Sequence, residues 1–357
     1  MVDAPIKLLI AASGTGGHLF PAIALAQELP DYQIEWLGVP NRLETQLVPQ
    51  QYRLNTISVE GFQKGFGISS LLTVGKLVGS VLKVRKILQN GQFQGVFTTG
   101  GYIAGPAIIA ARSLGIPVIL HEANALPGKV TRFFGPWCNA VALGFEVAAK
   151  YLPRAKTIYT STPVRSEFLE PGVASSLDLG IPENAPVIVV FGGSQGAVAI
   201  NNLVRECATA WFDVGAWVVH LTGDKDPEAE NLKHPQYISL PFYNNMAALL
   251  QRANLAISRS GAGSLTELAV CGTPAILIPY PFAAEDHQTY NAQVFTSVGA
   301  ALMFQQRELT VEKLQTEVLR LLQSPQELKA MGEKAKTIAP ADSVEKLAQL
   351  VREMVEK

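Results

Sequence analysis

Short runs of hydrophobic residues alternate with longer amphipathic segments along the whole chain. The runs predict buried β-strands at 7–12, 33–38, 95–100, 117–122, 140–144, 157–160, 187–193, 217–223, 237–242, 255–261 and 275–280. Segments with helical periodicity stand between them, for example at 21–29, 107–115, 199–211 and 264–272. This alternation is typical of βαβ units, in which helices cover both faces of a parallel sheet.

The two halves of the chain begin alike, each with a hydrophobic strand, a glycine-rich turn and a helix. The matching stretches are KLLIAASGTGGH (7–18) and VIVVFGGSQGA (187–197). We therefore predict an α/β fold of two doubly wound parallel-sheet domains, with a ligand between the carboxyl ends of the two sheets. The predicted parts are domain 1–162, domain 163–338 and a helix, 339–357, that could cross back to the first domain.

Composition narrows the class of protein. The chain has 357 residues, 48% of them hydrophobic, and a net charge of −1. It contains no run of about 18 apolar residues, so we expect no bilayer span, and its start does not resemble a signal peptide. Three distant cysteines (Cys138, Cys207 and Cys271) lack metal-ligand spacing. They predict buried, reduced thiols, and we expect neither a metal nor a cofactor.

Charge is distributed unevenly along the chain. Residues 1–160 carry 14 Lys and Arg against 8 Asp and Glu, and the remainder carry 15 against 22. The stretch 61–121 has no acid but six basic residues, Lys64, Lys76, Lys83, Arg85, Lys86 and Arg112. Such a block indicates an anionic partner or simply a solvated face. Nucleic acid is disfavoured because aromatic residues do not alternate with the basic ones and the second half is acidic.

Part of this basic stretch, 68–88, has the period of an amphipathic helix. Its hydrophobic arc comprises Leu71, Val74, Val78, Val81 and Leu82, interrupted by Arg85, and its opposite side comprises Lys76, Lys83 and Lys86. One interpretation is a helix packed on the sheet with solvated lysines. The other is a helix that docks on an anionic membrane surface.

Three glycine-rich loops, 13–18, 99–106 and 192–197, each follow a predicted strand and precede a helix. The free N–H groups and the dipole of a helix start favour a phosphate, and glycine lets it approach the backbone. Glycines that only form turns are the alternative. A dinucleotide site is disfavoured because Leu19 replaces the third glycine of G-x-G-x-x-G and the strand 33–38 lacks a ribose-binding acid after it. The Walker P-loop pattern is absent.

A metal-binding interpretation is open for Asp224-Lys225-Asp226, because two carboxylates one residue apart can bind a divalent cation. The motif follows a predicted strand, and a lysine separates its acids. We expect a solvated turn there.

Four motifs resemble the MurG family of glycosyltransferase family 28. They are GTGGHLFP (14–21), GIPVILHEANALPGKVTR (115–132), GGSQGA (192–197) and the block from SRSGAGSLTE to DHQTYNA (258–292). The resemblance extends from residue 6 to about residue 338. It implies the GT-B fold, in which two Rossmann-like domains enclose a cleft.

The implied activity is the inverting transfer of N-acetylglucosamine from UDP-N-acetylglucosamine to the C4 hydroxyl of undecaprenyl-diphospho-N-acetylmuramoyl-pentapeptide (lipid I to lipid II) in peptidoglycan synthesis. A related glycolipid transferase, a UDP-N-acetylglucosamine epimerase and a non-catalytic nucleotide-binding module are the alternatives. The family also implies a peripheral location on the cytoplasmic face of the bacterial plasma membrane, an anionic membrane partner, cell-wall synthesis proteins as further partners, and roles in cell shape and division.

The same resemblance implies individual site residues. The residues expected to line the cleft are Thr15, Gly16 and Gly17. Those expected to meet the transferred sugar of the donor are Asn124, Gln288 and Asn291. Near the diphosphate and the uracil are Arg165, Ser194 and Tyr243, of which Tyr243 stands where the family commonly has isoleucine. Around the nucleotide are Ala262, Gly263, Ser264, Leu265, Thr266 and Glu267, with Glu267 on the ribose hydroxyls.

The residue types suit these roles. A carboxylate accepts two hydroxyl hydrogen bonds, and arginine presents fixed donors to phosphate oxygens. Alternatively, Arg165 forms a surface ion pair with Glu167 or Glu170, and Glu267 is an exposed helix acid. For the general base we predict His18, because an imidazole takes up a proton near neutral pH.

Two adjacent residues are the other candidates for the general base. Glu122 is the runner-up, and the adjacent His121 is the weaker candidate.

Overall fold

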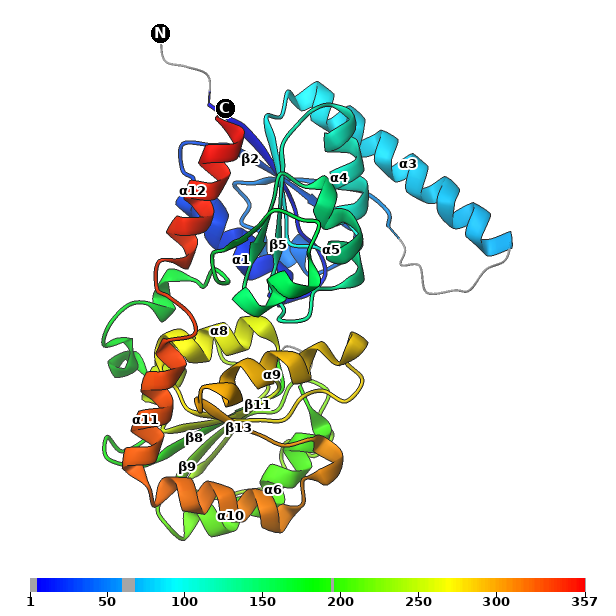
Figure 1. The fold of residues 1–357 in the computed structure, drawn as a ribbon. Helices are drawn as coiled ribbons and strands as arrows, with labels where there is room; N and C mark the ends of the chain where they lie inside the picture. The colour runs from blue at the N-terminus through cyan, green and yellow to red at the C-terminus, as the bar shows by residue number, and fades with distance from the viewer. Residues whose placement is uncertain (1–4, 60–67, 194–195, 357) are drawn as a thin grey trace. The chain divides into compact units, whose positions relative to one another are not determined.

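The computed structural model describes residues 5–59, 68–193 and 196–356, with the backbone alone for 68–74. Contacts divide the chain into unit 1 (Met1–Val164 and Asp342–Lys357) and unit 2 (Arg165–Ala341). Each unit is a parallel sheet with helices on both faces (Figure 1). The predicted α/β fold of two Rossmann-like parallel-sheet domains is therefore confirmed.

The sheet of unit 1 has the strand order β3-β2-β1-β4-β5-β6-β7. Its strands are β1 (Lys7–Ala11), β2 (Gln33–Gly38), β3 (Arg53–Thr56), β4 (Gly95–Thr98), β5 (Val118–Glu122), β6 (Ala140–Leu143) and β7 (Thr157–Tyr159). Its helices are α1 (Gly16–Glu28), α2 (Glu44–Leu47), α3 (Ile68–Gly91), α4 (Ala104–Ser113), α5 (Lys129–Phe134) and α12 (Ser343–Val355).

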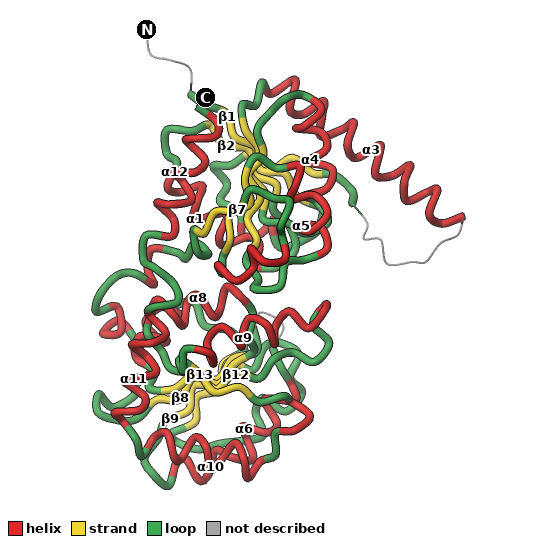
Figure 2. The backbone as a smooth tube through the Cα atoms, viewed as in Figure 1, coloured by secondary structure: helices red, strands yellow, loops and turns green. Residues whose placement is uncertain are grey.

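Side chains of β1 alternate between two hydrophobic cores because successive residues of a strand point to opposite faces. Leu8 and Ile10 pack with α1 and α12, whereas Leu9 and Ala11 pack with α3 and α4. The last helix, α12, thus belongs to the core of the first unit, and Figure 2 shows it beside α1.

The sheet of unit 2 has the order β10-β9-β8-β11-β12-β13. Its strands are β8 (Val187–Phe191), β9 (Trp217–Leu221), β10 (Tyr237–Leu240), β11 (Leu255–Ser258), β12 (Ala275–Leu277) and β13 (Ala301–Met303). Its α-helices are α6 (Val198–Phe212), α7 (Met246–Arg252), α8 (Ala262–Cys271), α9 (His287–Ser297), α10 (Val311–Leu322) and α11 (Pro325–Lys336). Helices α6 and α10 pack on one face of the sheet, with Trp211 and Leu314 fully buried, and α8 and α9 lie on the other face (Figure 1).

All of the predicted strands are confirmed, and the described part of the chain contains two strands, β3 and β13, that were missed. Both β3 and β13 lie at sheet edges and have only three or four residues. Neither RLNT nor ALM forms the long apolar run that marks a strand buried on both faces.

The helix predicted at 68–88 is confirmed as α3, but it packs through a face shifted from the predicted arc. Val84 and Leu88 are buried against α4, whereas Val78 and Leu82 are 51% and 60% exposed. The side chains of Leu71 and Val74 lie outside the described residues.

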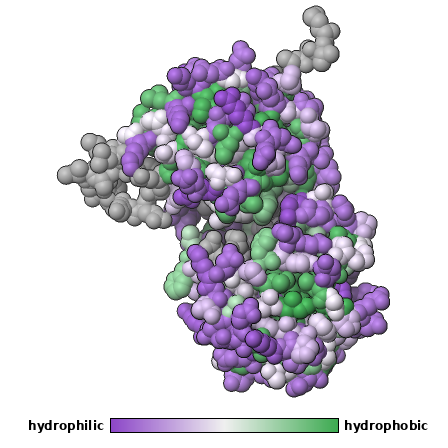
Figure 3. Space-filling model, turned by 180° about the vertical axis from the view of Figure 1, so that it is seen from behind, coloured by the Kyte–Doolittle hydropathy of each residue, from purple (hydrophilic) through white to green (hydrophobic). Residues whose placement is uncertain are grey.

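The surface carries mostly hydrophilic residues on the face shown in Figure 3, with smaller hydrophobic areas between them. Within the residues that the structure describes, no helix has both the length and the hydropathy that a membrane span needs.

Candidate active site

The first glycine-rich loop of unit 1 meets the loop after β4 where the strand order reverses. Ligands of open α/β sheets bind at such a switch point. Gly14, Gly100 and Gly101 adopt φ angles of 107°, 86° and 71°. These left-handed conformations strain any residue with a side chain, so the glycines are required by the turns themselves.

His18 lies between these two loops. Its Nδ1 is 2.7 Å from the backbone oxygen of Thr99. Because a carbonyl oxygen can only accept, Nδ1 carries the hydrogen, and Nε2 of the neutral ring keeps its lone pair. Nε2 lies 3.9 Å from the position that a Cβ on Gly101 would occupy. The contact thus leaves the nitrogen on the Gly101 side able to take up a proton.

Glu44 holds the glycine-rich loop 13–18 by hydrogen bonds, a role that the sequence analysis missed. Its carboxylate is 1% exposed and accepts hydrogen bonds from the Ser13 hydroxyl (2.5 Å) and from the backbone N–H groups of Gly14 (3.2 Å) and Val39 (2.7 Å). The chain separation of about thirty residues between Glu44 and the loop gave no sequence signal for this contact.

Glu122 uses both carboxylate oxygens within its own loop. It accepts from the backbone N–H groups of Asn124 and Gly128 (both 3.0 Å), from Asn124 Nδ2 (3.1 Å) and from the Thr131 hydroxyl (2.5 Å). Burial lowers the pKa of the adjacent His121 to about 4, and its Nε2 faces the Ser161 carbonyl at 3.3 Å. This geometry favours His18 over both as the base.

Thr15, Gly16 and Gly17 surround the start of α1. Thr15 is the N-cap, and its carbonyl accepts from the backbone N–H groups of His18 (3.0 Å) and Leu19 (3.2 Å). Thr15 and Gly17 are exposed at this helix start. They are therefore accessible to a ligand.

The glycine-rich loop 192–197 leads from β8 into α6 in unit 2. A Cβ on Gly192 would lie 2.4 Å from the Cβ of Ala197, and one on Gly196 would lie 2.5 Å from the carbonyl oxygen of Thr222. The loop therefore has no space for side chains at these two positions. Ser194, the predicted diphosphate residue, lies outside the described residues.

The first turns of α8 present one accessible face to solvent. Gly263, Ser264 and Glu267 are partly exposed, whereas Ala262, Leu265 and Thr266 are buried. An added Cβ on Gly261, the N-cap, would meet nothing within 4 Å. Of the six nucleotide residues predicted here, the structure thus leaves three side-chain positions open to a ligand.

Arg165 and Glu267 approach each other in unit 2. Arg165 precedes the short 3₁₀ helix η3 (Ser166–Phe168); its Nη1 is 2.8 Å from Glu167 Oε1 and its Nη2 is 3.9 Å from Glu267 Oε1. The side chain of Glu267 is 19% exposed, and this burial raises its pKa from 4.5 to about 7, although Arg165 opposes the rise. The ion pair with Glu167, given above as the alternative for Arg165, is therefore present, and Glu267 is not the exposed helix acid of the other alternative.

Gln288 and Asn291, from α9, both hold Ser260, which follows β11. Gln288 Oε1 accepts from the backbone N–H groups of Ser260 (3.2 Å) and Tyr280 (2.9 Å), and Asn291 Nδ2 donates to the Ser260 carbonyl (3.1 Å). Asn291 has no exposed surface. In this structure these side chains shape the turn between β11 and α8.

Arg259 is a second residue that the sequence analysis missed. Its guanidinium is buried and donates to the carbonyls of Ile278 (3.1 Å) and Pro279 (3.0 Å) and to Gln306 Oε1 (2.6 Å). Burial lowers its pKa to about 10. It fixes the path of the loop between β12 and α9.

Tyr243 is partly buried, and this desolvation raises the pKa of its hydroxyl.

The loop 281–286 contains two consecutive non-glycine residues with left-handed backbone, Glu285 (φ 53°) and Asp286 (φ 58°). Such strained positions cluster at functional sites.

The expectation of a solvated turn at Asp224-Lys225-Asp226 is wrong for Asp226. Asp224 is exposed, but the Asp226 carboxylate is buried and accepts from Arg205 Nη1 (2.8 Å) and Asn201 Nδ2 (2.6 Å). Among the residues that the structure describes, no group of three His, Cys, Asp or Glu side chains is placed to hold a metal ion.

Family models match both units. The N-terminal domain of glycosyltransferase family 28 matches residues 8–143, and the C-terminal domain of that family matches residues 187–349. The chain belongs to glycosyltransferase family 28. A family member from Nostoc punctiforme, named UDP-N-acetylglucosamine–N-acetylmuramyl-(pentapeptide) pyrophosphoryl-undecaprenol N-acetylglucosamine transferase, is 78% identical over 100% of both chains.

Solved structures agree with the family assignment. The crystal structure of MurG from Acinetobacter baumannii is 29% identical and covers 98% of this chain and 100% of its own, with a TM-score of 0.80. The glycotransferase of kitacinnamycin is 15% identical over 98% of this chain and 99% of its own, with a TM-score of 0.74. The second likeness shows the shared fold alone.

Proposed function

We propose that this family 28 protein transfers N-acetylglucosamine from UDP-N-acetylglucosamine to the C4 hydroxyl of the N-acetylmuramoyl sugar in undecaprenyl-linked lipid I. The observation that carries the proposal is the 78% identity, over the full length of both chains, to a relative named for this activity. The glycine loops at both switch points and the accessible face of α8 support a sugar-nucleotide substrate.

His18 is the general base of this reaction. Its Nε2 takes the proton of the acceptor hydroxyl while the oxygen attacks C1 of the donor sugar. The bond from C1 to the diphosphate oxygen breaks, its electron pair leaves with UDP, and the configuration at C1 inverts. The hydrogen bond from Nδ1 to the Thr99 carbonyl holds the ring in the tautomer that this step requires.

The departing UDP gains negative charge, which unit 2 stabilises at its helix starts. Glu267 accepts hydrogen bonds from the hydroxyls of the ribose, and Arg165 donates hydrogen bonds to the diphosphate. Because Arg165 already contacts Glu167 at 2.8 Å, the incoming phosphate competes with that carboxylate for its donors. Ser194, Tyr243, Gln288 and Asn124 complete the proposed donor contacts, whereas Asn291, which has no exposed surface, acts only by holding Ser260.

The protein works at an anionic membrane surface, and α3 provides the contact. Val78 and Leu82 expose hydrophobic side chains, and Lys76, Lys83 and Lys86 are exposed on the same helix. Hydrophobic residues at the level of the lipid headgroups and lysines beside anionic lipids stabilise binding together. The lipid-linked acceptor is present at the same surface.

The activity is tested by mixing radiolabelled UDP-N-acetylglucosamine with lipid I and separating the lipid product. We expect label in the lipid fraction and equimolar UDP. Conversion of the donor without an acceptor would instead indicate an epimerase, and UDP binding without turnover would indicate a binding module. Transfer only to another lipid acceptor would indicate a related glycolipid transferase.

Membrane docking is tested by replacing Lys76, Lys83 and Lys86 with Glu together. Each lysine near an anionic surface contributes about 1 kcal/mol, so binding to vesicles that contain phosphatidylglycerol should fall at least a hundredfold. Activity on a soluble acceptor should remain. Unchanged vesicle binding would refute the assignment of α3.

A further inference from the structure

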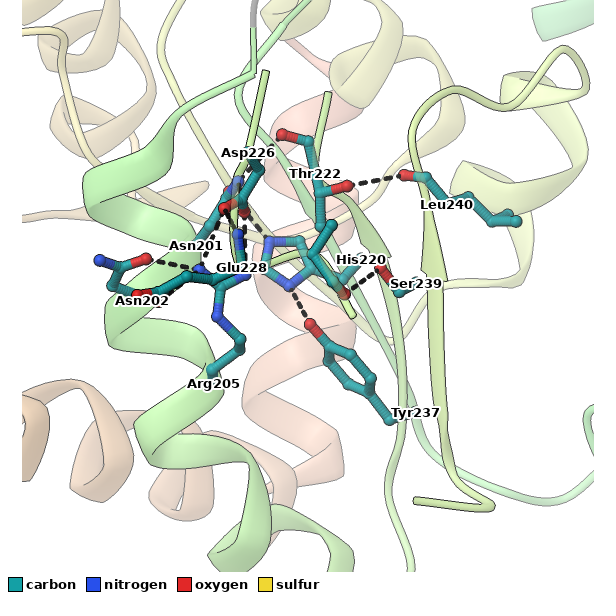
Figure 4. A network of polar contacts seen from close by, with 11 residues as sticks. Asn201, Asn202, Arg205, His220, Thr222, Asp226, Glu228, Tyr237, Ser239 and Leu240 are labelled. Atoms are coloured by element: carbon teal, nitrogen blue, oxygen red, sulfur yellow. Dashed lines mark hydrogen bonds and ion pairs between the residues drawn. The ribbon is translucent and has the colours of Figure 1, made fainter. Parts of the chain in front are cut away.

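A buried polar cluster lies in unit 2 at the end of β9, beside the first turns of α6 (Figure 4). His220, from β9, has no exposed surface. Its Nδ1 is 2.7 Å from the hydroxyl of Tyr237 in β10, and its Nε2 is 3.0 Å from Oδ1 of Asn201 in α6. The cluster therefore joins two strands to α6, the helix that follows the glycine-rich loop 192–197.

The amide of Asn201 determines which atoms donate. Its Nδ2 donates to the carbonyl of Thr222 (2.9 Å) and to Asp226 Oδ2 (2.6 Å), so its Oδ1 must accept from His220. His220 Nε2 therefore carries the hydrogen, and Nδ1 accepts from Tyr237. Burial lowers the pKa of His220 to about 3, so the ring keeps this neutral tautomer at neutral pH.

The carbonyl of Thr222 that Asn201 holds also packs against the glycine turn. A Cβ on Gly196 would lie 2.5 Å from this oxygen, and the φ of Gly196 is 69°. The N–H of Gly196 donates to the carbonyl of Gly193 (3.0 Å), and Ala197 accepts the backbone N–H of Asn201 (2.9 Å). The carbonyl oxygen of Thr222 thus contacts both the glycine turn at Gly196 and the side chain of Asn201 in the first turns of α6.

A buried ion pair supports the other end of the cluster. Arg205, one turn further along α6, donates to both oxygens of Asp226 at 2.8 and 3.3 Å. Asp226 also accepts the backbone N–H of Glu228 (3.0 Å). The segment after β9 is therefore fixed to α6 through Asp226 as well as through Thr222.

We propose that His220 is a positioning residue for the diphosphate of the sugar nucleotide. It orients the amide of Asn201, and Asn201 holds the Thr222 carbonyl against the turn that leads into α6. The free N–H groups at the start of α6 then point at the diphosphate. This inference rests on the proposed function and adds a residue that does not itself touch the substrate.

A matched pair of variants tests the role. In His220→Gln the amide nitrogen can occupy the place of Nε2 and still donate to Asn201, whereas in His220→Asn the side chain reaches only the place of Nδ1. We expect His220→Asn to raise the KM for UDP-N-acetylglucosamine and the Kd for UDP about tenfold to a hundredfold, because a buried acceptor loses its donor. His220→Gln should stay within about threefold of the wild type, and the KM for lipid I should not change in either.

Tyr32→Phe is the control, because Tyr32 loses a comparable hydrogen bond, to Glu356 at 2.8 Å, in unit 1. If His220→Asn does not unfold cooperatively, Tyr237→Phe replaces it. We expect a threefold to tenfold rise of the donor KM there, since Nδ1 of the buried ring then loses its hydrogen-bond donor and the ring is held less firmly against Asn201. The inference would be overturned if His220→Asn and His220→Gln had equal KM values for the donor. Where Tyr237→Phe is used instead, a donor KM equal to that of the wild type would overturn it. Absence of transfer by the wild-type protein would refute the proposed function instead.

Discussion

The protonation of Glu267 links the stability of unit 2 to pH and, in the proposed function, to nucleotide binding. The Glu267 side chain is 19% exposed, and its pKa is raised from 4.5 to about 7, mainly because the carboxyl is buried. In the unfolded chain the carboxyl loses its proton near pH 4.5, but in the folded protein it keeps the proton up to about pH 7. The contribution of Glu267 to the free energy of unfolding therefore decreases as the pH rises through this window, and it is lost above about pH 7.

The magnitude follows from the two pKa values. At 1.36 kcal/mol per pKa unit the gap corresponds to about 3 kcal/mol. Glu267→Gln keeps the shape and cannot ionise, so it should not lose stability in this window. Relative to the wild type, the free energy of unfolding of the variant should rise by about 3 kcal/mol between pH 4.5 and pH 8. For a unit of this size that is roughly 6–12 °C in Tm.

The assay is urea and thermal unfolding at several pH values, with Glu230→Gln, an exposed acid of the same unit, as control. The transition that UDP-N-acetylglucosamine shifts identifies unit 2 in the wild type. UDP-N-acetylglucosamine should bind about tenfold more weakly at pH 6 than at pH 8, because the protonated carboxyl has only one oxygen left to accept from the two ribose hydroxyls. Parallel pH dependence of unfolding in wild type and Glu267→Gln would refute the reasoning.

Two further variants test unit 1. His18→Ala should lower kcat about 10²-fold to 10⁴-fold without changing the Kd for UDP, measured by single-turnover kinetics and calorimetry; a near-native kcat at every pH would exclude His18 as the base. Glu44→Gln replaces one accepting oxygen with a donor that faces either the N–H of Gly14 or the donors of Ser13 and Val39, so it should destabilise unit 1 by about 1–3 kcal/mol in urea unfolding and raise the KM for lipid I. The exposed Glu28→Gln is its control, and equal stability of the two variants would contradict the role of Glu44.

The strands could be predicted because parallel strands covered on both faces must be hydrophobic throughout. β8, VIVVF, is buried at every position, and its sequence shows this directly. The edge strands β3 and β13 are short and less buried, so their sequences carry no comparable signal. The face through which α3 packs was also misjudged, because Val78 and Leu82 are as hydrophobic as the buried Val84 and Leu88.

Asp226 shows the same limit for charged residues. A D-x-D in a loop is expected to be solvated, yet this carboxylate is buried against Arg205 and Asn201, which are more than twenty residues away in the chain. The stabilising partners of a buried charge are supplied by packing of distant segments.

Local order along the chain was sufficient to specify two parallel-sheet units and to place the glycine loops after strand ends, with His18 next to the first of these loops. Those features depend on the hydrophobic period and on backbone conformations that only glycine adopts readily, both of which are written in neighbouring residues. The tautomer of His18, the raised pKa of Glu267 and the contacts of Glu44, Arg259 and His220 were decided by folding. Each depends on hydrogen bonds or desolvation from residues distant in sequence, and these arise only when the elements pack together.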